Sequence, residues 1–233
     1  MNPKDESTYS LLSDKAIDRY YQKDEIIIDP FTYDNLNPNS YDVTLGENYF
    51  KEQDLRDEWV SNIYNLYSQE ATERIWGKSQ KALPYSFYKE KGIELENIRP
   101  DEKIIFINPG ETILGHTNEF IGGKTTVTTM MKARSSLGRN FIEVCSCAGL
   151  GDIGYFNRWT MEIRNNSKKY KIPLIVGRRI AQIVFFDTEG IVGNNYNQKG
   201  KYQTYTNLEE LKIKWKPEDM LPKMYRDFEN FKN

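Results

Sequence analysis

The segment Lys132–Arg139 is the densest group of side chains in the sequence that could bind or activate a substrate. In it, Arg134 and Arg139 stand on either side of the hydroxyl groups of Ser135 and Ser136. Guanidinium groups, hydroxyls and the backbone N–H groups of a turn all bind phosphate oxygens. The same residue types also suit a solvated turn or helix start, which is the commoner use of such a segment. On this octapeptide alone, a solvated turn or helix start is therefore the more common alternative, and a phosphate site is the less common one.

Two later segments supply candidate carboxylates. Ala148–Phe156 carries three glycines around Asp152, a pattern typical of a turn that lets the backbone approach a flat ligand, although a plain hairpin turn is the more common use. In Arg158–Arg164, alternate residues of a strand share one face, so Thr160 and Glu162 lie together. If that face lines a pocket, Glu162 is a candidate general base. A lone glutamate on a strand is otherwise usually solvent-facing, and the sequence leaves both alternatives open.

Zinc hydrolysis and Ser-His-Asp catalysis are not expected. A zinc deaminase needs a His and Glu pair followed by P-C-x-x-C, whereas this sequence has one histidine, His116, and only Cys145 and Cys147 in a C-x-C. We expect these two cysteines to be buried strand residues. His116 has no nucleophile motif beside it. The chain also carries no Walker loop and no G-x-G-x-x-G.

Length, charge and hydropathy exclude several classes of protein. The 233 residues suffice for one large domain, and 32 Lys and Arg against 34 Asp and Glu give a net charge of −2. A chain so close to neutral has no general positive field to hold duplex nucleic acid. Its apolar runs fall far short of the roughly 18 residues of a membrane helix, and its start has no apolar signal region. We therefore expect a cytoplasmic protein without a duplex nucleic-acid or membrane partner.

The elements that must position these residues are predicted mainly as short strands. Ser13–Tyr21 has the N-cap and apolar spacing of a helix, and 25–29 and 40–45 follow as strands. From Lys103 on, Gly or Pro interrupts the chain roughly every eight to twelve residues, which predicts a sandwich or barrel and not a βαβ sheet. The strands expected there are 103–107, 112–117, 125–131, 141–145, 159–164, 172–176 and 180–186.

Three segments are predicted to fall outside this β pattern. Gly190–Thr206 is rich in glycine and asparagine and is a candidate mobile loop, and Leu208–Ile213 is expected to form a short helix in a charged tail. Residues from about 51 to 100 are predicted to form a peripheral insertion with one or two helices. The helical spacing lies across Leu55, Trp59, Ile63, Leu66 and Tyr67.

Taken in order along residues 11–50 and 100–205, the motifs resemble the dCTP deaminase family, which shares its fold with dUTPases. The segments that carry the resemblance are Asn37–Gly46, Asn108–Glu111, Arg134–Arg139, Asp152 with Gly154, Gly177–Gln182 and Tyr196–Gln203. The resemblance implies a mostly β, dUTPase-like distorted barrel or jelly roll with a few peripheral helices, assembled as a homotrimer. On this basis we expect a β domain over 1–206, with the insertion inside it, and a C-terminal extension over 207–233.

The resemblance also implies roles for residues. Glu162 would be the general base in a metal-free hydrolysis of dCTP to dUTP and ammonia, Arg139 would orient it, and Ser135 would position water or the leaving amine. No zinc is expected, and Mg²⁺ would arrive with the substrate triphosphate. Substrate-binding roles fall on residues around the nucleotide: Arg134, Ser136 and Lys201 at the phosphates, Asp152 at the 3′-hydroxyl, Tyr155 under the sugar, and Ala148, Thr160, Tyr196 and Gln203 as further contacts.

Two alternatives accompany deamination to dUTP. The first is cleavage of the phosphate chain, either by a bifunctional enzyme that forms dUMP from dCTP or by a dUTPase. A pure dUTPase normally lacks a glutamate where Glu162 stands and carries a glycine-rich lid that is missing here. The second is a nucleotide-binding regulator without turnover, which the altered segment Lys201–Tyr205 and the long insertion favour and which the presence of Arg139 and Glu162 opposes.

Overall fold

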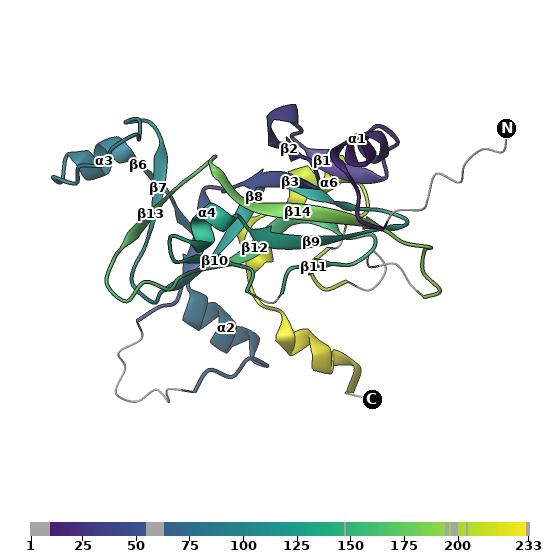
Figure 1. The fold of residues 1–233 in the computed structure, drawn as a ribbon. Coiled ribbons are helices and arrows are strands. Elements are labelled where there is room, and N and C mark those ends of the chain that lie inside the picture. The colour runs from purple at the N-terminus through teal and green to yellow at the C-terminus, as the bar shows by residue number, and fades with distance from the viewer. Residues whose placement is uncertain are drawn as a thin grey trace.

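The fold consists of antiparallel strands arranged in three sheets (Figure 1). A computed structural model of the chain describes residues 10–54, 63–146, 148–193, 196, 200–203 and 205–231. The largest sheet has the order β10 (Ile142–Val144), β12 (Phe156–Asn165), β8 (Thr112–Gly123), β4 (Asn48–Lys51) and β5 (Gln80–Lys81), and β1 (Ile26–Asp29) also pairs with β8. The second has the order β11 (Leu150–Gly151), β9 (Val127–Ala133), β14 (Arg179–Asp187), β3 (Ser40–Thr44) and β2 (Leu36–Asn37).

A smaller sheet and several short helices surround these two sheets. The smaller sheet has the order β13 (Ile172–Ile175), β7 (Lys103–Ile107) and β6 (Leu83–Pro84), and with α3 it projects to the left of the central body in Figure 1. The helices are α1 (Asp14–Gln22), α2 (Gln69–Trp76), α3 (Tyr85–Lys89), α4 (Ser135–Gly138) and α6 (Leu208–Lys214), with 3₁₀ turns η1 (Tyr33–Asn35), η2 (Pro217–Met220) and η3 (Met224–Phe231). Within the described residues, none of these helices is long and apolar enough to cross a membrane.

The main core lies between the two larger sheets. Tyr41 and Phe185 from one sheet and Ile121 and Met161 from the other are fully buried in the same cluster. Strand alternation produces this layer, since inward residues of each strand pack on the facing sheet and outward residues remain free for other contacts. The predicted sandwich or barrel architecture is therefore confirmed as a mostly β fold with few helices.

Most predicted elements are found close to their expected bounds, but the helix in the insertion is displaced. The strands expected after Lys103 correspond to β7, β8, β9, β10, β12, β13 and β14, and Ser13 caps α1 as predicted. The one or two helices expected in the insertion over 51–100 are found as α2 and α3, but the helical spacing across Leu55–Tyr67 is wrong where the structure describes it, because 63–67 are not helical. Residues 55–62 lie outside the described residues. The helix begins instead at Gln69, where the Ser68 hydroxyl accepts a hydrogen bond from Ala71 N–H.

The C-terminal extension packs on the outer face of the largest sheet. Leu211 of α6 is buried with Phe120 of β8 and Phe156 of β12. Farther along, Trp215 lies with its ring centroid 4.8 Å from the Arg158 guanidinium, a cation–π arrangement. These contacts attach the extension to β8 and to β12, the strand that carries Thr160 and Glu162.

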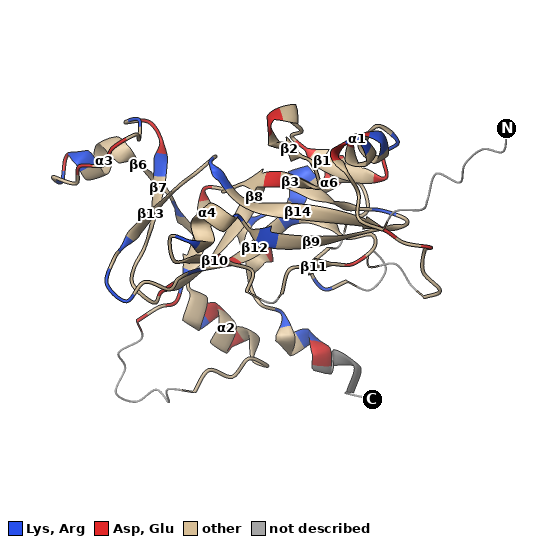
Figure 2. Cartoon of the chain, viewed as in Figure 1, with Lys and Arg blue, Asp and Glu red and all other residues tan. Residues whose placement is uncertain are grey.

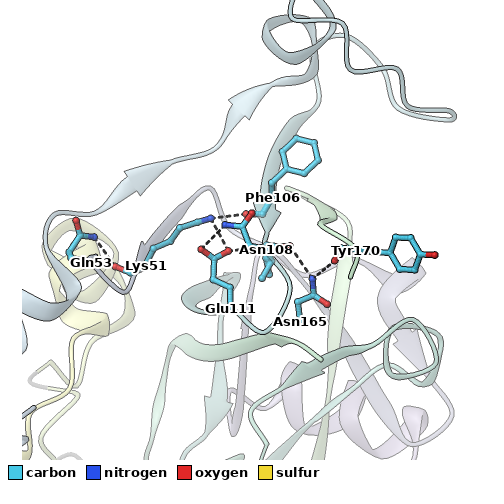
Figure 3. A network of polar contacts seen from close by, with 8 residues as sticks. Lys51, Gln53, Phe106, Asn108, Glu111, Asn165 and Tyr170 are labelled. Atoms are coloured by element: carbon cyan, nitrogen blue, oxygen red, sulfur yellow. Dashed lines mark hydrogen bonds and ion pairs between the residues drawn. The ribbon is translucent and has the colours of Figure 1, made fainter. Parts of the chain in front are cut away.

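A polar network holds the turn Asn108–Glu111 against the far end of β12 (Figure 3). The Lys51 ammonium lies 3.0 Å from the Glu111 carboxylate, which also accepts the Asn108 N–H at 2.7 Å. Asn165, the last residue of β12, donates its side-chain amide to two backbone carbonyls of neighbouring segments at 3.1 and 2.7 Å (Figure 3). The network fixes the end of the strand that carries Glu162.

His116 is a structural residue whose burial predicts a pH-dependent stability. The ring is 1% exposed, Nδ1 donates to the Thr117 carbonyl at 2.8 Å, and Nε2 accepts the Asn48 N–H at 3.3 Å. Burial lowers the pKa of His116 to about 4, against 6.5 in an exposed chain. Between those values the unfolded chain binds the additional proton, so stability falls as the pH decreases from 6.5 towards 4, by about 1 kcal/mol per pH unit.

Urea unfolding at pH 5, 6 and 7 checks this expectation. The variant His116→Gln should lose that part of the slope, since it has no imidazole to protonate. An unchanged slope in the variant would contradict the assignment to His116.

Candidate active site

A cavity of about 360 Å³ opens beside the outward face of β12. It brings together six of the predicted site residues from separate segments of the chain: Ala148, Asp152, Tyr155, Thr160, Glu162 and Tyr196. The alternation of β12 explains part of this set, because Met161 and Ile163 are fully buried in the core while Thr160 and Glu162 lie on the other face. The sequence leaves open whether Glu162 faces solvent or lines a pocket, and in the structure it lines the pocket.

Glu162 is the carboxylate at this cavity whose chemistry is most altered by its surroundings. It lies in the middle of β12, opposite Leu114 of β8, and its carbonyl accepts the Cys145 N–H at 3.0 Å. Burial raises the pKa of Glu162 above its ordinary value, and this effect outweighs the opposing hydrogen bonds from its own backbone and from the Cys145 thiol. A carboxylate with a raised pKa is a better proton acceptor, which is what a general base requires.

Aromatic rings form one side of the cavity. The ring centroids of Tyr155 and Tyr196 are 5.2 Å apart in an edge-to-face contact, and Tyr155 meets Trp159 in the same way at 5.4 Å. Trp159 is fixed in turn, since its indole N–H donates to the Ile121 carbonyl at 2.8 Å. These contacts fix the three rings against one another, and they form an aromatic side of the cavity against which a sugar or a base can pack.

The turn that carries Asp152 is built as the glycine pattern predicted. Tyr155 N–H donates to the Asp152 carbonyl at 3.0 Å, and Gly154 has a φ of 89°, a left-handed conformation that favours glycine. Gly154 N–H also donates to the Gly123 carbonyl at 3.0 Å, which attaches the turn to β8. Asp152 itself is exposed and lines the cavity, and a carboxylate at this place can accept from a ligand hydroxyl.

Two predicted substrate contacts have other partners in this structure. Gln203 is 2% exposed, and its amide accepts the Phe156 N–H at 2.7 Å and donates to the Gly154 carbonyl at 3.1 Å. It therefore fastens the chain to the Asp152 turn and does not line the cavity. Lys201 forms an ion pair with Asp227 of the extension. Of the candidate mobile loop, residues 194–195, 197–199 and 204 lie outside the described residues.

The Arg-Ser-Ser segment does not join the Glu162 cavity within one chain. Ser135, Ser136 and Arg139 are exposed on and beside α4, and over the described residues Arg139 makes no ion pair with Glu162. Arg134 points elsewhere, with its Nε 3.3 Å from the buried carboxylate of Asp42. The expected pair of Arg139 with Glu162 is thus not formed in the single chain.

Arg134 lies instead at a second cavity of about 780 Å³, whose lining shares no residue with that of the Glu162 cavity. Glu119, Arg178 and Arg179 also line it. Basic and acidic residues are interspersed along the chain (Figure 2), in agreement with its near-neutral total charge. The single chain therefore carries the predicted site in two parts, a carboxylate cavity and an exposed guanidinium–hydroxyl segment.

No metal centre is evident in the parts of the chain that the structure describes, where no group of three or more His, Cys, Asp or Glu side chains is arranged to hold a metal ion. Cys145 is buried as predicted and lies just after β10. Cys147 lies outside the described residues.

Sequence reasoning missed six residues that line the Glu162 cavity: Leu150, Gly151, Trp159, Tyr202, Met220 and Pro222. Trp159 belongs to the core face by simple alternation, but the register of β12 against β8 shifts between Arg158 and Thr160, and this irregularity leaves Trp159 at the edge of the cavity. Met220 and Pro222 come from the extension, and nothing in the local sequence there indicates a site.

Comparison with known proteins places these observations in a family. The family model described as dCTP deaminase-like matches residues 11–188. A relative named dCTP deaminase, dUMP-forming, from Methanococcus maripaludis strain C7 is 30% identical over 84% of this chain and 89% of its own length. A relative of the same name from Clostridium botulinum strain Eklund 17B is also 30% identical, over 94% of this chain and 99% of its own length.

The fold is similar to that of a solved structure. The 2′-deoxycytidine 5′-triphosphate deaminase from Agrobacterium tumefaciens aligns with a TM-score of 0.53 at 16% identity, over 77% of this chain. This chain spans about half of that longer protein, 49%. At this identity the likeness concerns the fold.

Proposed function

The chain belongs to the dCTP deaminase-like family, and from this premise we propose that it hydrolyses the amino group of dCTP with Glu162 as general base. The observation that supports the proposal best is the position of Glu162, a half-buried carboxylate with a raised pKa in a 360 Å³ cavity. In the same cavity, Asp152 can accept from the 3′-hydroxyl of a deoxyribose, and the tyrosine rings can pack against the apolar C–H groups of the sugar.

The proposed chemistry is a hydrolytic exchange at C4 of the cytosine. Glu162 accepts one proton from a water molecule as the water oxygen bonds to C4, and it delivers this proton to N3 of the ring. The second proton of the water then passes from the new C4 hydroxyl to the amino group. The C4–N bond breaks, ammonia leaves and a uracil ring remains, so one water is consumed for each ammonia released. General base catalysis contributes typically about 10²–10⁴-fold, and positioning must supply much of the remainder.

We propose that a neighbouring copy completes the site in a homotrimer. Arg134, Ser135, Ser136 and Arg139 lie away from the cavity of their own chain, and three of them are exposed. Guanidinium and hydroxyl groups supplied by a second copy would meet the triphosphate, and Arg139 of that copy would orient Glu162. Mg²⁺ carried by the triphosphate would neutralise further charge.

The names of the relatives favour dUMP as the final product over dUTP. From the sequence, dUTP is the expected product, whereas both relatives described above are named as dUMP-forming. We propose that this chain also forms dUMP. A second water would then attack the α-phosphorus, the bond to the bridging oxygen of the β-phosphate would break, and diphosphate would leave.

Incubation of the protein with dCTP and Mg²⁺ tests the products directly. We expect ammonia, dUMP and diphosphate in equal amounts. Ammonia with dUTP as the sole nucleotide product would retain the deamination and overturn the second hydrolysis. Nucleotide binding without any release of ammonia would overturn the enzyme proposal and favour the nucleotide-binding regulator.

A further inference from the structure

We propose that the C-terminal extension supplies a specificity wall of the nucleotide cavity, in which Met220 and Pro222 reject a ribose 2′-hydroxyl. The inference rests on the proposed function. It assigns a role to a segment, 207–231, that lies beyond the matched family region of residues 11–188.

The wall is formed by two apolar side chains from the end of η2 and the residues after it. Met220 and Pro222 line the same cavity as Glu162 and Asp152. Met220 is 3% exposed and packs with Phe50 of β4 and Leu114 of β8. Its position is therefore set by packing on the outer face of the largest sheet, and the same residue lines the cavity.

The extension is held from several sides, so the wall is rigid. Tyr202, which also lines the cavity, accepts the Lys223 N–H on its hydroxyl at 3.2 Å, just beyond Pro222. The Lys201 ammonium pairs with Asp227 in η3. From the insertion, Trp76 at the end of α2 packs in the same cluster as Met220. The insertion and the extension, which are distant in sequence, thus pack in one cluster beside the cavity.

The chemistry of this wall differs from that of the rest of the cavity. Asp152, Thr160 and Glu162 offer oxygen atoms to polar groups of a ligand, whereas Met220 and Pro222 offer no hydrogen-bonding partner of comparable strength. Asp152 is the proposed acceptor of the 3′-hydroxyl, and in this proposal the neighbouring C2′ is directed towards the apolar side of the same cavity, at Met220 and Pro222. A deoxyribose presents CH₂ there, while a ribose would place a hydroxyl against apolar atoms. A pocket of this kind discriminates by up to about 100-fold.

The test compares kcat/KM for dCTP with that for CTP, which differ only at C2′. We expect Met220→Ala to lower the dCTP:CTP ratio by about tenfold, because the shortened side chain leaves room for a solvated hydroxyl. Met220→Leu, which conserves volume and polarity, should keep the ratio within about threefold. The matched control is Leu221→Ala, since Leu221 packs in the same cluster without lining the cavity. A ratio unchanged in Met220→Ala, or lowered equally in Leu221→Ala, would overturn the proposal.

A second pair of measurements separates this inference from folding defects and from the proposed function. Pro222 forms the other half of the wall and is less buried than Met220, so its replacement is less disruptive to folding. Pro222→Ala should also lower the dCTP:CTP ratio of kcat/KM. Binding of dCTP and CTP to Glu162→Gln, by calorimetry, requires no turnover. If Glu162→Gln binds dCTP more tightly than CTP, and the double variant with Met220→Ala binds the two equally, the result supports the proposed wall. This holds even if the protein releases no ammonia. Equal binding of dCTP and CTP by Glu162→Gln itself would overturn it.

Discussion

Replacement of Glu162 by glutamine is expected to lower kcat for ammonia release by about 10²–10⁴-fold, while affinity for dCTP stays within about tenfold. Glutamine keeps the size and hydrogen-bonding reach of the side chain but cannot accept a proton from water. The loss therefore falls on the transition state, in which the proton moves, and not on ground-state binding. Steady-state release of ammonia, together with direct binding of dCTP, measures the two quantities separately.

Glu143→Gln is the matched control for this prediction. Glu143 lies on β10, which pairs with β12, and it contacts Ser146 and Asn166 outside the Glu162 cavity. The same change of charge on the adjacent strand should leave kcat within about twofold, because the group touches no reacting atom. Wild-type activity in Glu162→Gln would show that another group is the base, and an equal loss in Glu143→Gln would indicate a general disturbance of the sheet.

The part of this site that could be predicted from the sequence is the part set by local geometry. Alternation on β12 separates Glu162 from its core-facing neighbours, and the glycine pattern fixes the turn that carries Asp152. Both follow from backbone rules that act over a few residues. The family resemblance gave Glu162 and Asp152 chemical roles, and the cavity that they share supports those roles.

What could not be predicted depends on contacts between distant segments. Gln203 was expected at the ligand, yet its amide is used by the backbone of Phe156 and Gly154, a choice that only the folded arrangement determines. Met220 reaches the cavity because Phe50 and Leu114 leave an apolar surface on the outer face of the sheet. A short charged tail with prolines contains no signal for that surface.

The misplaced helix of the insertion has a related cause. Ile63, Leu66 and Tyr67 have helical spacing, but each of these side chains is at least 44% exposed. Periodicity stabilises a helix only where its apolar stripe is buried. The helix forms after Ser68, where a side-chain cap is present and Trp76 reaches the cluster of Met220.

Replacement of Gly122 by alanine is expected to destabilise the protein by about 3 kcal/mol and to lower Tm by roughly 6 to 12 °C. Gly122 lies on β8, opposite Phe156 of β12 and Ile27 of β1. A Cβ at this position would lie 2.0 Å from the Tyr155 carbonyl oxygen and 2.6 Å from the Phe156 Cα. These are backbone atoms of the paired strand, which cannot move aside as a side chain could. Thermal and urea unfolding measure the loss.

The same substitution should also reach the cavity, because the displaced residue Tyr155 lines it. We therefore expect a weaker affinity for dCTP in the folded fraction of Gly122→Ala, a readout that separates local displacement from overall instability. Gly138→Ala is the matched control, since a Cβ on this helical glycine meets nothing within 4 Å. Helix propensity then favours alanine by up to about 1 kcal/mol, so this control should be neutral or slightly stabilised. Equal stability of the two variants would mean that β8 and β12 approach less closely than the register of Gly122 against Phe156 requires.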